Sequence, residues 1–251
     1  MKGGVKIEQI NLLIREFERI KRKGWIKSIS DNTSGVGRTF ENELGIFENN
    51  FPYADYYNIE LKCTTKKKFG YINLFSAEPN TKETRLIEDI AKHYGYPDKN
   101  FVDTNILNTS INSKVSSFIS FKYKATIYID EKNKYLKVLI EDYYGRVVDD
   151  RITWDTEYLK EKIADKCKII ALIKAEKRRF NDVLYIKYKE LSVYELKDVK
   201  KIIKNIENGN IRITFKVSVN KKGIKKGKLH NHGTSFEINI NKIEELFTKV
   251  H

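Results

Sequence analysis

The amino-acid sequence predicts a mixed fold of α-helices and β-strands. Apolar residues recur at the 3.6-residue helical period near the N-terminus, whereas apolar and polar residues alternate over much of the chain after residue 118. Hydrophobic residues make up 40% of the 251 residues, which is too large a share for a disordered chain and enough for a sizeable core. We therefore expect an α+β protein of one large or two small domains.

The first half of the chain combines helical and extended patterns. Amphipathic or capped helical patterns predict helices over three segments, 5–22, 39–46 and 81–94. Short apolar runs bounded by turn residues predict strands at 56–63 and 70–76. The stretch 95–117 is polar and irregular, and we expect a loop or a domain boundary there.

The second half is richer in strands. Two alternating segments flank residues 130–133 and predict an antiparallel hairpin, and a short helix is expected over 155–165. Continuous apolar runs predict buried strands at 167–175 and 183–189. Ser192 and Glu195 have the spacing of a capping box, which predicts a helix that ends at residues 208–209. The last elements expected are a strand at 211–219, a basic loop at 220–234 and a strand at 235–240. A short helix is expected at the C-terminus.

The net charge points to an anionic partner. The chain has 48 Lys and Arg residues against 34 Asp and Glu, a formal net charge of +14. Such an excess is typical of proteins that bind nucleic acid. A generally lysine-rich composition, as an AT-rich genome produces, explains the charge equally well.

Cysteine content and hydropathy limit the class of protein. The two cysteines, Cys63 and Cys167, are too few for a disulfide framework or a tetrahedral zinc site. No window approaches the roughly 18 apolar residues of a transmembrane helix, and the N-terminus lacks the apolar core of a secretory signal. We expect a cytoplasmic protein with no membrane partner.

One acidic cluster has the residues that metal-assisted hydrolysis needs. Glu60 and Lys62 are two apart on a predicted strand, so their side chains share a face, and Asp55 lies at the strand entrance. Two converging carboxylates suit Mg²⁺, which can activate a water molecule and offset charge on a phosphate. Glu41, on the preceding helix, is a further candidate carboxylate. The alternative interpretation is an exposed strand face with paired charges.

A second candidate is the basic segment 221–232. It contains the lysines Lys225, Lys226 and Lys228, which can attract DNA phosphates without regard to sequence. His230 and His232 are two apart and are expected to project together, where they could donate to guanine in the major groove. The alternatives are metal ligation by the two histidines and a solvated basic hairpin.

These motifs resemble those of a known family. The segments GVGRTFE (35–41) and ADYYNIELK (54–62) are similar to the PD-(D/E)-x-K nuclease fold and, more narrowly, to the MvaI/BcnI family of Type II restriction endonucleases, which is related to MutH. The resemblance continues through segments 169–176, 206–211 and 225–236, so it covers nearly the whole chain. One departure is Ala54, which stands where the family usually has proline before the aspartate; Pro52 lies two residues further upstream.

The resemblance implies a fold, an activity and partners. It implies a monomeric enzyme whose two lobes surround a DNA cleft, with residues 1–117 as the catalytic lobe and 118–251 mainly as the recognition lobe. Such an enzyme hydrolyses double-stranded DNA at a short site by nicking the two strands in turn. A cognate DNA methyltransferase is implied, because an unprotected genome would be cut.

The resemblance also implies roles for individual residues. Asp55 and Glu60 would hold Mg²⁺, for which Mn²⁺ can substitute, Lys62 would be the catalytic lysine, and Glu41 would support them.

The target sequence is less closely defined. In the MvaI branch of the family, arginines occupy the positions of Lys216 and Glu237. Because lysine grips guanine more weakly and glutamate accepts from cytosine instead, we expect a CCNGG-like site that differs from CCWGG or CCSGG. A MutH-like nicking enzyme and a catalytically inactive DNA-binding protein are the alternative functions.

Overall fold

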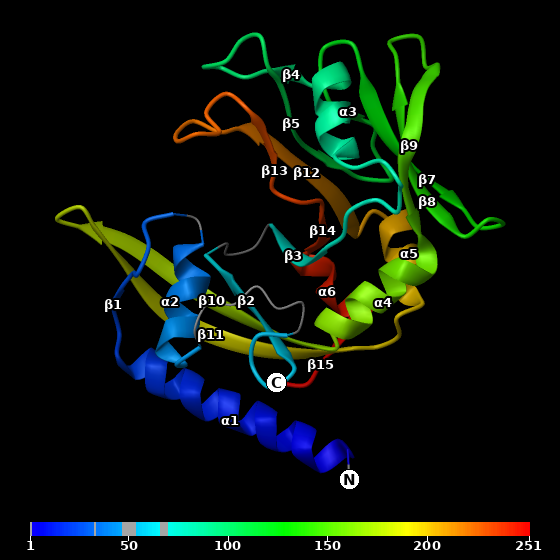
Figure 1. The fold of residues 1–251 in the computed structure, drawn as a ribbon. Helices are drawn as coiled ribbons and strands as arrows, with labels where there is room; N and C mark the ends of the chain where they lie inside the picture. The colour runs from blue at the N-terminus through cyan, green and yellow to red at the C-terminus, as the bar shows by residue number, and fades with distance from the viewer. Residues whose placement is uncertain (1, 33, 47–53, 66–69) are drawn as a thin grey trace. The chain divides into compact units, whose positions relative to one another are not determined.

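A computed structural model describes residues 2–32, 34–46, 54–65 and 70–251, with side chains from residue 7 onward (Figure 1). The chain contains both helices and long runs of consecutive strands, which confirms the mixed α+β class. The chain forms two compact units. Unit 1 comprises Met1–Ile72, Ala164–Lys197 and Ile240–His251, and unit 2 comprises Asn73–Ile163 and Asp198–Asn239. The roles assigned to residues 1–117 and 118–251 stay a prediction.

Unit 1 is built on a five-stranded sheet of order β1-β11-β10-β2, with β15 paired to β11. The strands are β1 (Ile26–Lys27), β2 (Ile59–Thr64), β10 (Ile169–Phe180), β11 (Val183–Leu196) and β15 (Phe247–Lys249). β10 and β11 form a long antiparallel hairpin, while β2 runs parallel to β10. The parallel pairing brings the acidic cluster on β2 beside a strand distant in the sequence.

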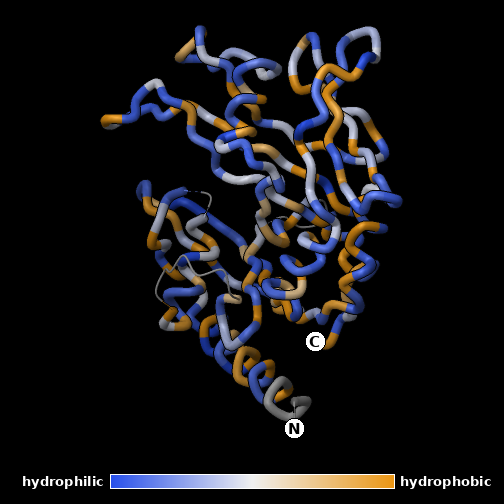
Figure 2. Tube along the Cα trace, turned by 45° about the vertical axis from the view of Figure 1, so that its right-hand side comes forward, coloured by the Kyte–Doolittle hydropathy of each residue, from blue (hydrophilic) through white to orange (hydrophobic). Residues whose placement is uncertain are grey.

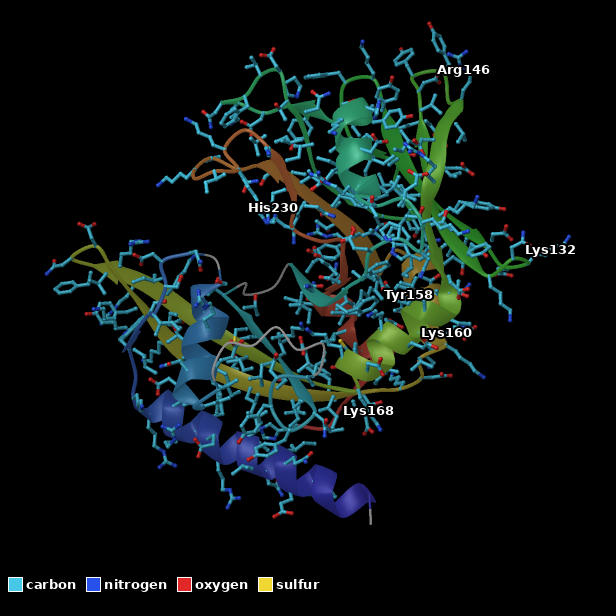
Figure 3. All side chains as sticks on the ribbon, viewed as in Figure 1. Lys132, Arg146, Tyr158, Lys160, Lys168 and His230 are labelled. Carbon is cyan, nitrogen blue, oxygen red and sulfur yellow. The ribbon has the colours of Figure 1, made fainter. Side chains whose placement is uncertain are left out.

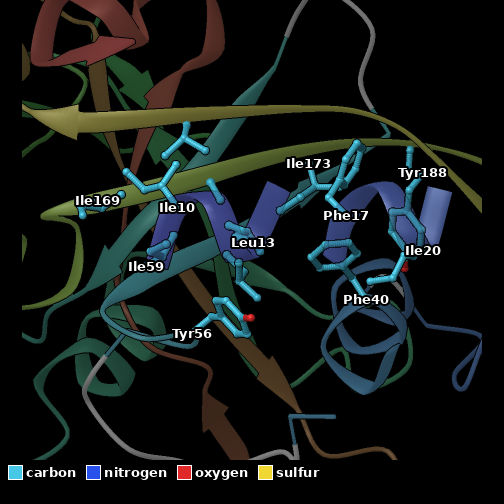
Figure 4. Packing of buried hydrophobic residues seen from close by; sticks show 14 of the residues in the cluster. Ile10, Leu13, Phe17, Ile20, Phe40, Tyr56, Ile59, Ile169, Ile173 and Tyr188 are labelled. Carbon is cyan, nitrogen blue, oxygen red and sulfur yellow. The ribbon is translucent and has the colours of Figure 1, made fainter. Parts of the chain in front are cut away.

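Two helices pack on the core of unit 1, whose buried residues come mostly from the sheet. Apolar residues recur along α1 (Lys2–Arg22) at the helical period, and they give orange segments between blue ones on its tube in Figure 2. Leu13, Phe17 and Ile20 are buried against residues of the sheet (Figure 4). Phe40, from α2 (Gly35–Glu43), contacts the ring of Tyr188 edge-on with the centroids 5.0 Å apart. The Tyr188 hydroxyl donates to the Val36 carbonyl over 2.8 Å, which fixes α2 to β11.

Unit 2 contains two further sheets. The first has six strands in the order β3-β14-β12-β5-β4, with β13 paired to β12. Its strands are β3 (Tyr71–Ser76), β4 (Tyr96–Pro97), β5 (Asn105–Ile111), β12 (Ile211–Val219), β13 (Leu229–Asn231) and β14 (Ser235–Asn239). The second sheet is an antiparallel meander of β6 (Ser117–Phe118), β7 (Lys124–Asp130), β8 (Tyr135–Glu141) and β9 (Val147–Asp155).

The remaining helices are short. They are α3 (Leu86–Tyr94), α4 (Thr156–Lys166), α5 (Lys201–Glu207), the 3₁₀ turn η1 (Ile240–Lys242) and α6 (Ile243–Leu246). None of the helices in the described ranges is long and apolar enough to cross a membrane.

Strand β12 of unit 2 has one apolar face and one polar face. Ile213, Phe215 and Val217 are buried, and Trp154 packs against the ring of Phe236 with centroids 5.5 Å apart. The residues between them on β12 point to the opposite face, because neighbouring side chains on a strand alternate. The sheet therefore offers a polar surface supported by a rigid core.

Several sequence-based predictions are confirmed and others are wrong. The helix at the N-terminus and the hairpin around residues 130–133 are confirmed as α1 and β7–β8. The expected loop at 95–117 is wrong, because β5 lies there in the six-stranded sheet. The helix expected from Ser192 is wrong in its start and right in its end: β11 continues to Leu196, held by its pairing with β10, and α5 spans only Lys201–Glu207.

Candidate active site

A tight turn brings Asp55 back toward β2. Tyr56 and Ile59 exchange backbone hydrogen bonds of 3.0 and 2.7 Å, and the two residues between them, Tyr57 and Asn58, have φ angles of 46° and 68°. Asp55 then accepts a hydrogen bond on Oδ2 from the backbone N–H of Leu61, over 3.0 Å. The carboxylate at the strand entrance is thus fixed next to the strand that carries the other two residues of the cluster.

Glu60 and Lys62 lie on one face of β2, as the two-residue spacing predicts. Lys62 Nζ donates to Glu60 Oε1 over 2.6 Å, and the Glu60 side chain is only 3% exposed. A second ammonium, that of Lys166 at the end of α4, lies 3.5 Å from the same oxygen. Glu60 Oε2 is buried and has no hydrogen-bond partner among the described residues.

The protonation states follow from this burial. Burial raises the pKa of Glu60 above its usual value, and the charge of Asp55 adds to the increase, while Lys62 offsets part of it. Burial disfavours the charged form of Lys62, but the neighbouring Glu60 outweighs it and raises the pKa of the ammonium. Lys62 is therefore a charged hydrogen-bond donor at neutral pH, and Asp55 and Glu60 are close enough to repel each other.

Glu41 approaches β2 from α2. Burial raises the pKa of the Cys63 thiol, and the charges of Glu41 and Asp55 raise it further, so both carboxylates lie within electrostatic range of this strand. Cys63 follows Lys62 and packs against the apolar core of unit 1, on the opposite side of the strand. A supporting role for Glu41 at the metal stays a prediction.

The donor set fits a hard divalent cation. Mg²⁺ is commonly held by one or two carboxylates and keeps several water ligands, which matches a pair of carboxylates. Glu60 Oε2 is a buried oxygen with no hydrogen-bond donor among the residues that the structure describes, an arrangement that a bound cation would stabilise. In the ranges that the structure describes, no group of three or more His, Cys, Asp and Glu side chains could hold a metal ion, so water or backbone oxygens would complete the ligand shell.

The histidine pair lies in unit 2. His230 extends from β13 (Figure 3), and its ring centroid is 4.4 Å from that of His232, so the two side chains project together as expected. His232 Nε2 is 2.7 Å from Ser218 Oγ, and its backbone N–H donates to the Lys216 carbonyl over 2.8 Å. Burial, His230 and Lys216 lower the pKa of His232, which favours the neutral ring.

The basic loop is exposed. Lys225, Lys226 and Lys228 lie in the turn between β12 and β13. Gly223 and Gly227 have φ angles of 74° and 82°, which the turn requires and which other residues adopt at a cost. The lysines are thus presented to solvent, where they can meet a polyanion.

Lys216 and Glu237 meet on the polar face of the six-stranded sheet. Lys216 Nζ donates to Glu237 Oε1 over 3.2 Å, while Arg212 donates to Glu237 Oε2 from Nε and Nη2, over 2.9 and 2.7 Å. Sequence reasoning missed Arg212. Arg212 and Lys216 are an even number of residues apart, so the sequence could have placed them on the same face of β12. The sequence could not show that Arg212 pairs with Glu237 on the neighbouring strand.

Sequence reasoning also missed Glu78, which precedes the histidine loop in the sequence by more than a hundred residues. Glu78 Oε1 accepts from the Thr234 backbone N–H over 2.9 Å, and Oε2 accepts from Asn231 Nδ2 over 3.1 Å. Asn231 in turn accepts from the Gly233 backbone N–H over 2.9 Å. The Glu78 carboxylate therefore holds the chain both before and after His232. Pro52, noted in the sequence upstream of Ala54, lies outside the described residues.

Comparisons with known proteins give matches over nearly the whole chain. The model of the MvaI/BcnI restriction endonuclease family matches residues 14–247. A solved complex of restriction endonuclease MvaI with its cognate DNA substrate is 28% identical, with a TM-score of 0.87, over 96% of this chain and 97% of that one. MvaI in the absence of DNA is 29% identical, with a TM-score of 0.58, over 96% of each chain. No curated protein matches the sequence significantly.

Proposed function

Because the chain belongs to the MvaI/BcnI restriction endonuclease family, we propose that it is a Type II enzyme that hydrolyses double-stranded DNA at a short specific site. The observation that carries the proposal is the state of Glu60. Its carboxylate is almost wholly buried, one oxygen is held by Lys62, and the other has no partner in the described part of the chain. Burying a carboxylate with one unpaired oxygen costs free energy. Ionisable groups in such environments are typical of functional sites.

Asp55 and Glu60 are the proposed ligands of Mg²⁺, with Mn²⁺ as a possible substitute, and Glu41 is the supporting carboxylate. When bound, the ion lowers the pKa of a water molecule and offsets the negative charge that develops on the phosphate. The hydrogen bond from Leu61 orients Asp55, and the rigid pairing of β2 with β10 orients Glu60. The chain thus supplies two fixed anionic oxygens before any ion arrives.

Lys62 has a separate role. Its raised pKa favours the charged ammonium, which can act as a hydrogen-bond donor. A donor beside Glu60 can orient the attacking water and stabilise the negative oxygens of the phosphate in the transition state. We assign these two tasks to Lys62.

DNA recognition is proposed for the polar face of unit 2. The lysines of the basic loop supply sequence-independent attraction, and His230, His232, Lys216 and Glu237 belong to the surface proposed to meet the bases. The relative MvaI is solved with its cognate DNA substrate, which supports duplex DNA as the partner. The proposed target is a CCNGG-like site.

The remaining features of the proposal come from the family resemblance. They are a monomer that nicks the two strands in turn, a two-lobed arrangement around a DNA cleft, and a cognate methyltransferase that protects the host genome. An enzyme with one active site must turn over twice to cut a duplex, so nicked circles should appear before linear DNA.

Plasmid digestion tests the proposal. With Mg²⁺ we expect discrete fragments that share one end sequence, and with EDTA we expect none. A smear would contradict site-specific cleavage but not nuclease activity. Nicked circles as the stable end product would favour a MutH-like enzyme, and intact DNA under every metal condition would favour an inactive DNA-binding protein.

A further inference from the structure

The strand pairing of β12 with β14 sets Arg212 directly opposite Glu237. Two N–H groups of the guanidinium, on Nε and Nη2, donate to Oε2 of the carboxylate over 2.9 and 2.7 Å. The two charge-assisted bonds converge on one oxygen, and together they restrict the arginine fork more than a single contact does. The Arg212 side chain keeps 29% of its surface exposed, so it is held but still accessible.

Glu237 is placed to hold other side chains. Its own side chain is only 9% exposed, and its second oxygen accepts from Lys216 Nζ over 3.2 Å. Both oxygens are thus engaged by cations. Three of the roughly four acceptor sites of the carboxylate are thus used by Arg212 and Lys216 inside a largely desolvated site, which favours a positioning role.

The ion pair of Arg212 and Glu237 lies next to the residues that are proposed to contact DNA bases. Along β12, Arg212, Lys216 and Ser218 share one face because they are even numbers of residues apart. Ser218 forms a hydrogen bond with His232. The same strand buries Ile213, Phe215 and Val217 on its other face, which prevents it from shifting. Arg212 is therefore on a rigid element, in line with the residues proposed to read bases.

We propose that Arg212 is a specificity-determining residue that reads a guanine, and that Glu237 is a positioning residue that fixes Arg212 and Lys216. Glu237 binds the side edge of the guanidinium, formed by Nε and Nη2, and a fork bound on that edge can use its end-on edge for guanine O6 and N7. The inference rests on the proposed function, because it requires that this face meets the major groove of DNA.

The test measures base preference without cleavage. The whole chain is incubated in Ca²⁺ with a pool of duplexes of randomised sequence, and the bound duplexes are sequenced. The variants are Arg212→Lys, which keeps the charge and loses the fork, and Glu237→Gln, which keeps the shape and loses the charge. The matched controls are Arg146→Lys and Asp142→Asn, an exposed pair in the turn between β8 and β9 with a bond of 2.7 Å (Figure 3).

We expect both test variants to lose preference at the same guanine by roughly 10- to 100-fold, while affinity for unselected DNA stays within about twofold. Replacing that guanine by 7-deazaguanine should weaken binding of the unchanged protein and have no further effect on Arg212→Lys. The control variants should keep the original preference. Thermal unfolding of each variant identifies any that fails to fold, and the 7-deazaguanine series on the unchanged protein still reports whether a guanine N7 is read.

Two results would overturn the inference. One is an unchanged profile for Arg212→Lys together with a changed cytosine preference for Glu237→Gln, which would make Glu237 the direct reader. The other is a selected site in which no guanine is sensitive to 7-deaza substitution. If the unchanged protein selects no sequence at all, the proposed site-specific function itself fails, which is a distinct outcome.

Discussion

Lys166, at the end of α4, lies 3.5 Å from Oε1 of Glu60, so α4 supplies a second cation to the carboxylate of β2. The Lys166 side chain is 32% exposed, whereas that of Lys62 is 14% exposed. A cation with this accessibility can contact a phosphate of bound DNA and still compensate Glu60.

We predict that Lys166→Met slows cleavage about 10- to 100-fold, because it removes a fixed donor from a site where negative charge develops. The measurement is the single-turnover rate constant on a duplex that contains the selected site. The matched control is Lys160→Met on the same helix, where Lys160 pairs with Glu157 over 2.8 Å (Figure 3). Equal rates for the two variants would remove Lys166 from the active site.

A second prediction separates the structural and the chemical roles of Lys62. Lys62→Met should abolish cleavage and also destabilise the protein by roughly 2–3 kcal/mol, below the range for a fully buried pair because Lys166 remains near Glu60. The double variant Lys62→Met/Glu60→Gln should regain most of this stability, since no buried charge is left without a partner, yet remain inactive. Chemical denaturation and plasmid cleavage report the two effects.

Binding of DNA by both inactive variants should persist, because the proposed recognition surface lies in unit 2. Cleavage by Lys62→Met at more than a tenth of the original rate would refute the role assigned to the ammonium.

The third prediction concerns Glu78, which holds Thr234 and Asn231. Glu78→Ala should lower the ratio of specific to non-specific DNA affinity roughly tenfold, because losing a charge-assisted hydrogen bond costs about 1.5–3 kcal/mol and the histidine loop becomes less ordered. Competitive binding with selected and unselected duplexes measures the ratio. The control is Glu83→Ala, an exposed carboxylate that pairs with Arg151; an identical loss in both variants would contradict the positioning role of Glu78.

The fourth prediction is a pH dependence. Burial opposes ionisation of Glu237, but the hydrogen bonds from Arg212 outweigh it and lower the pKa of the carboxyl below its ordinary value of 4.5. A lowered pKa contributes stability that is fully present above the ordinary value and is lost as the pH falls through the folded-state value. The free energy of unfolding of the unchanged protein should therefore exceed that of Glu237→Gln at pH 7, and the difference should shrink below about pH 4.5. A difference that stays constant down to pH 3 would contradict the lowered pKa.

The sequence predicted those elements whose own residues decide their structure. The apolar stripe of α1 and the alternation in β12 each select one local conformation, because only that conformation places all the apolar side chains on one side. The shared face of Glu60 and Lys62 could be predicted for the same reason, since it depends only on two-residue spacing.

The other elements and site residues depend on contacts with segments that are distant in the sequence. Ser192 and Glu195 have the spacing of a helix cap, but β10 offers a complete set of strand hydrogen bonds and β11 continues through them. Residues 105–111 are too polar to predict a strand, yet β12 pairs with them. Lys166, Glu78 and Arg212 were missed because each becomes significant only through the carboxylate, loop or strand that the fold brings to it.

The central claim is that Asp55 and Glu60 together bind one divalent cation. Anomalous diffraction from crystals soaked in Mn²⁺ tests it most directly, because the method locates the ion without relying on activity. We expect a single strong peak within about 2.0–2.3 Å of a carboxylate oxygen of each residue, Glu60 Oε2 among them, and no such peak for Glu60→Gln. A peak elsewhere in the chain, or none at this position in crystals of protein that cleaves DNA with Mn²⁺, would contradict the claim.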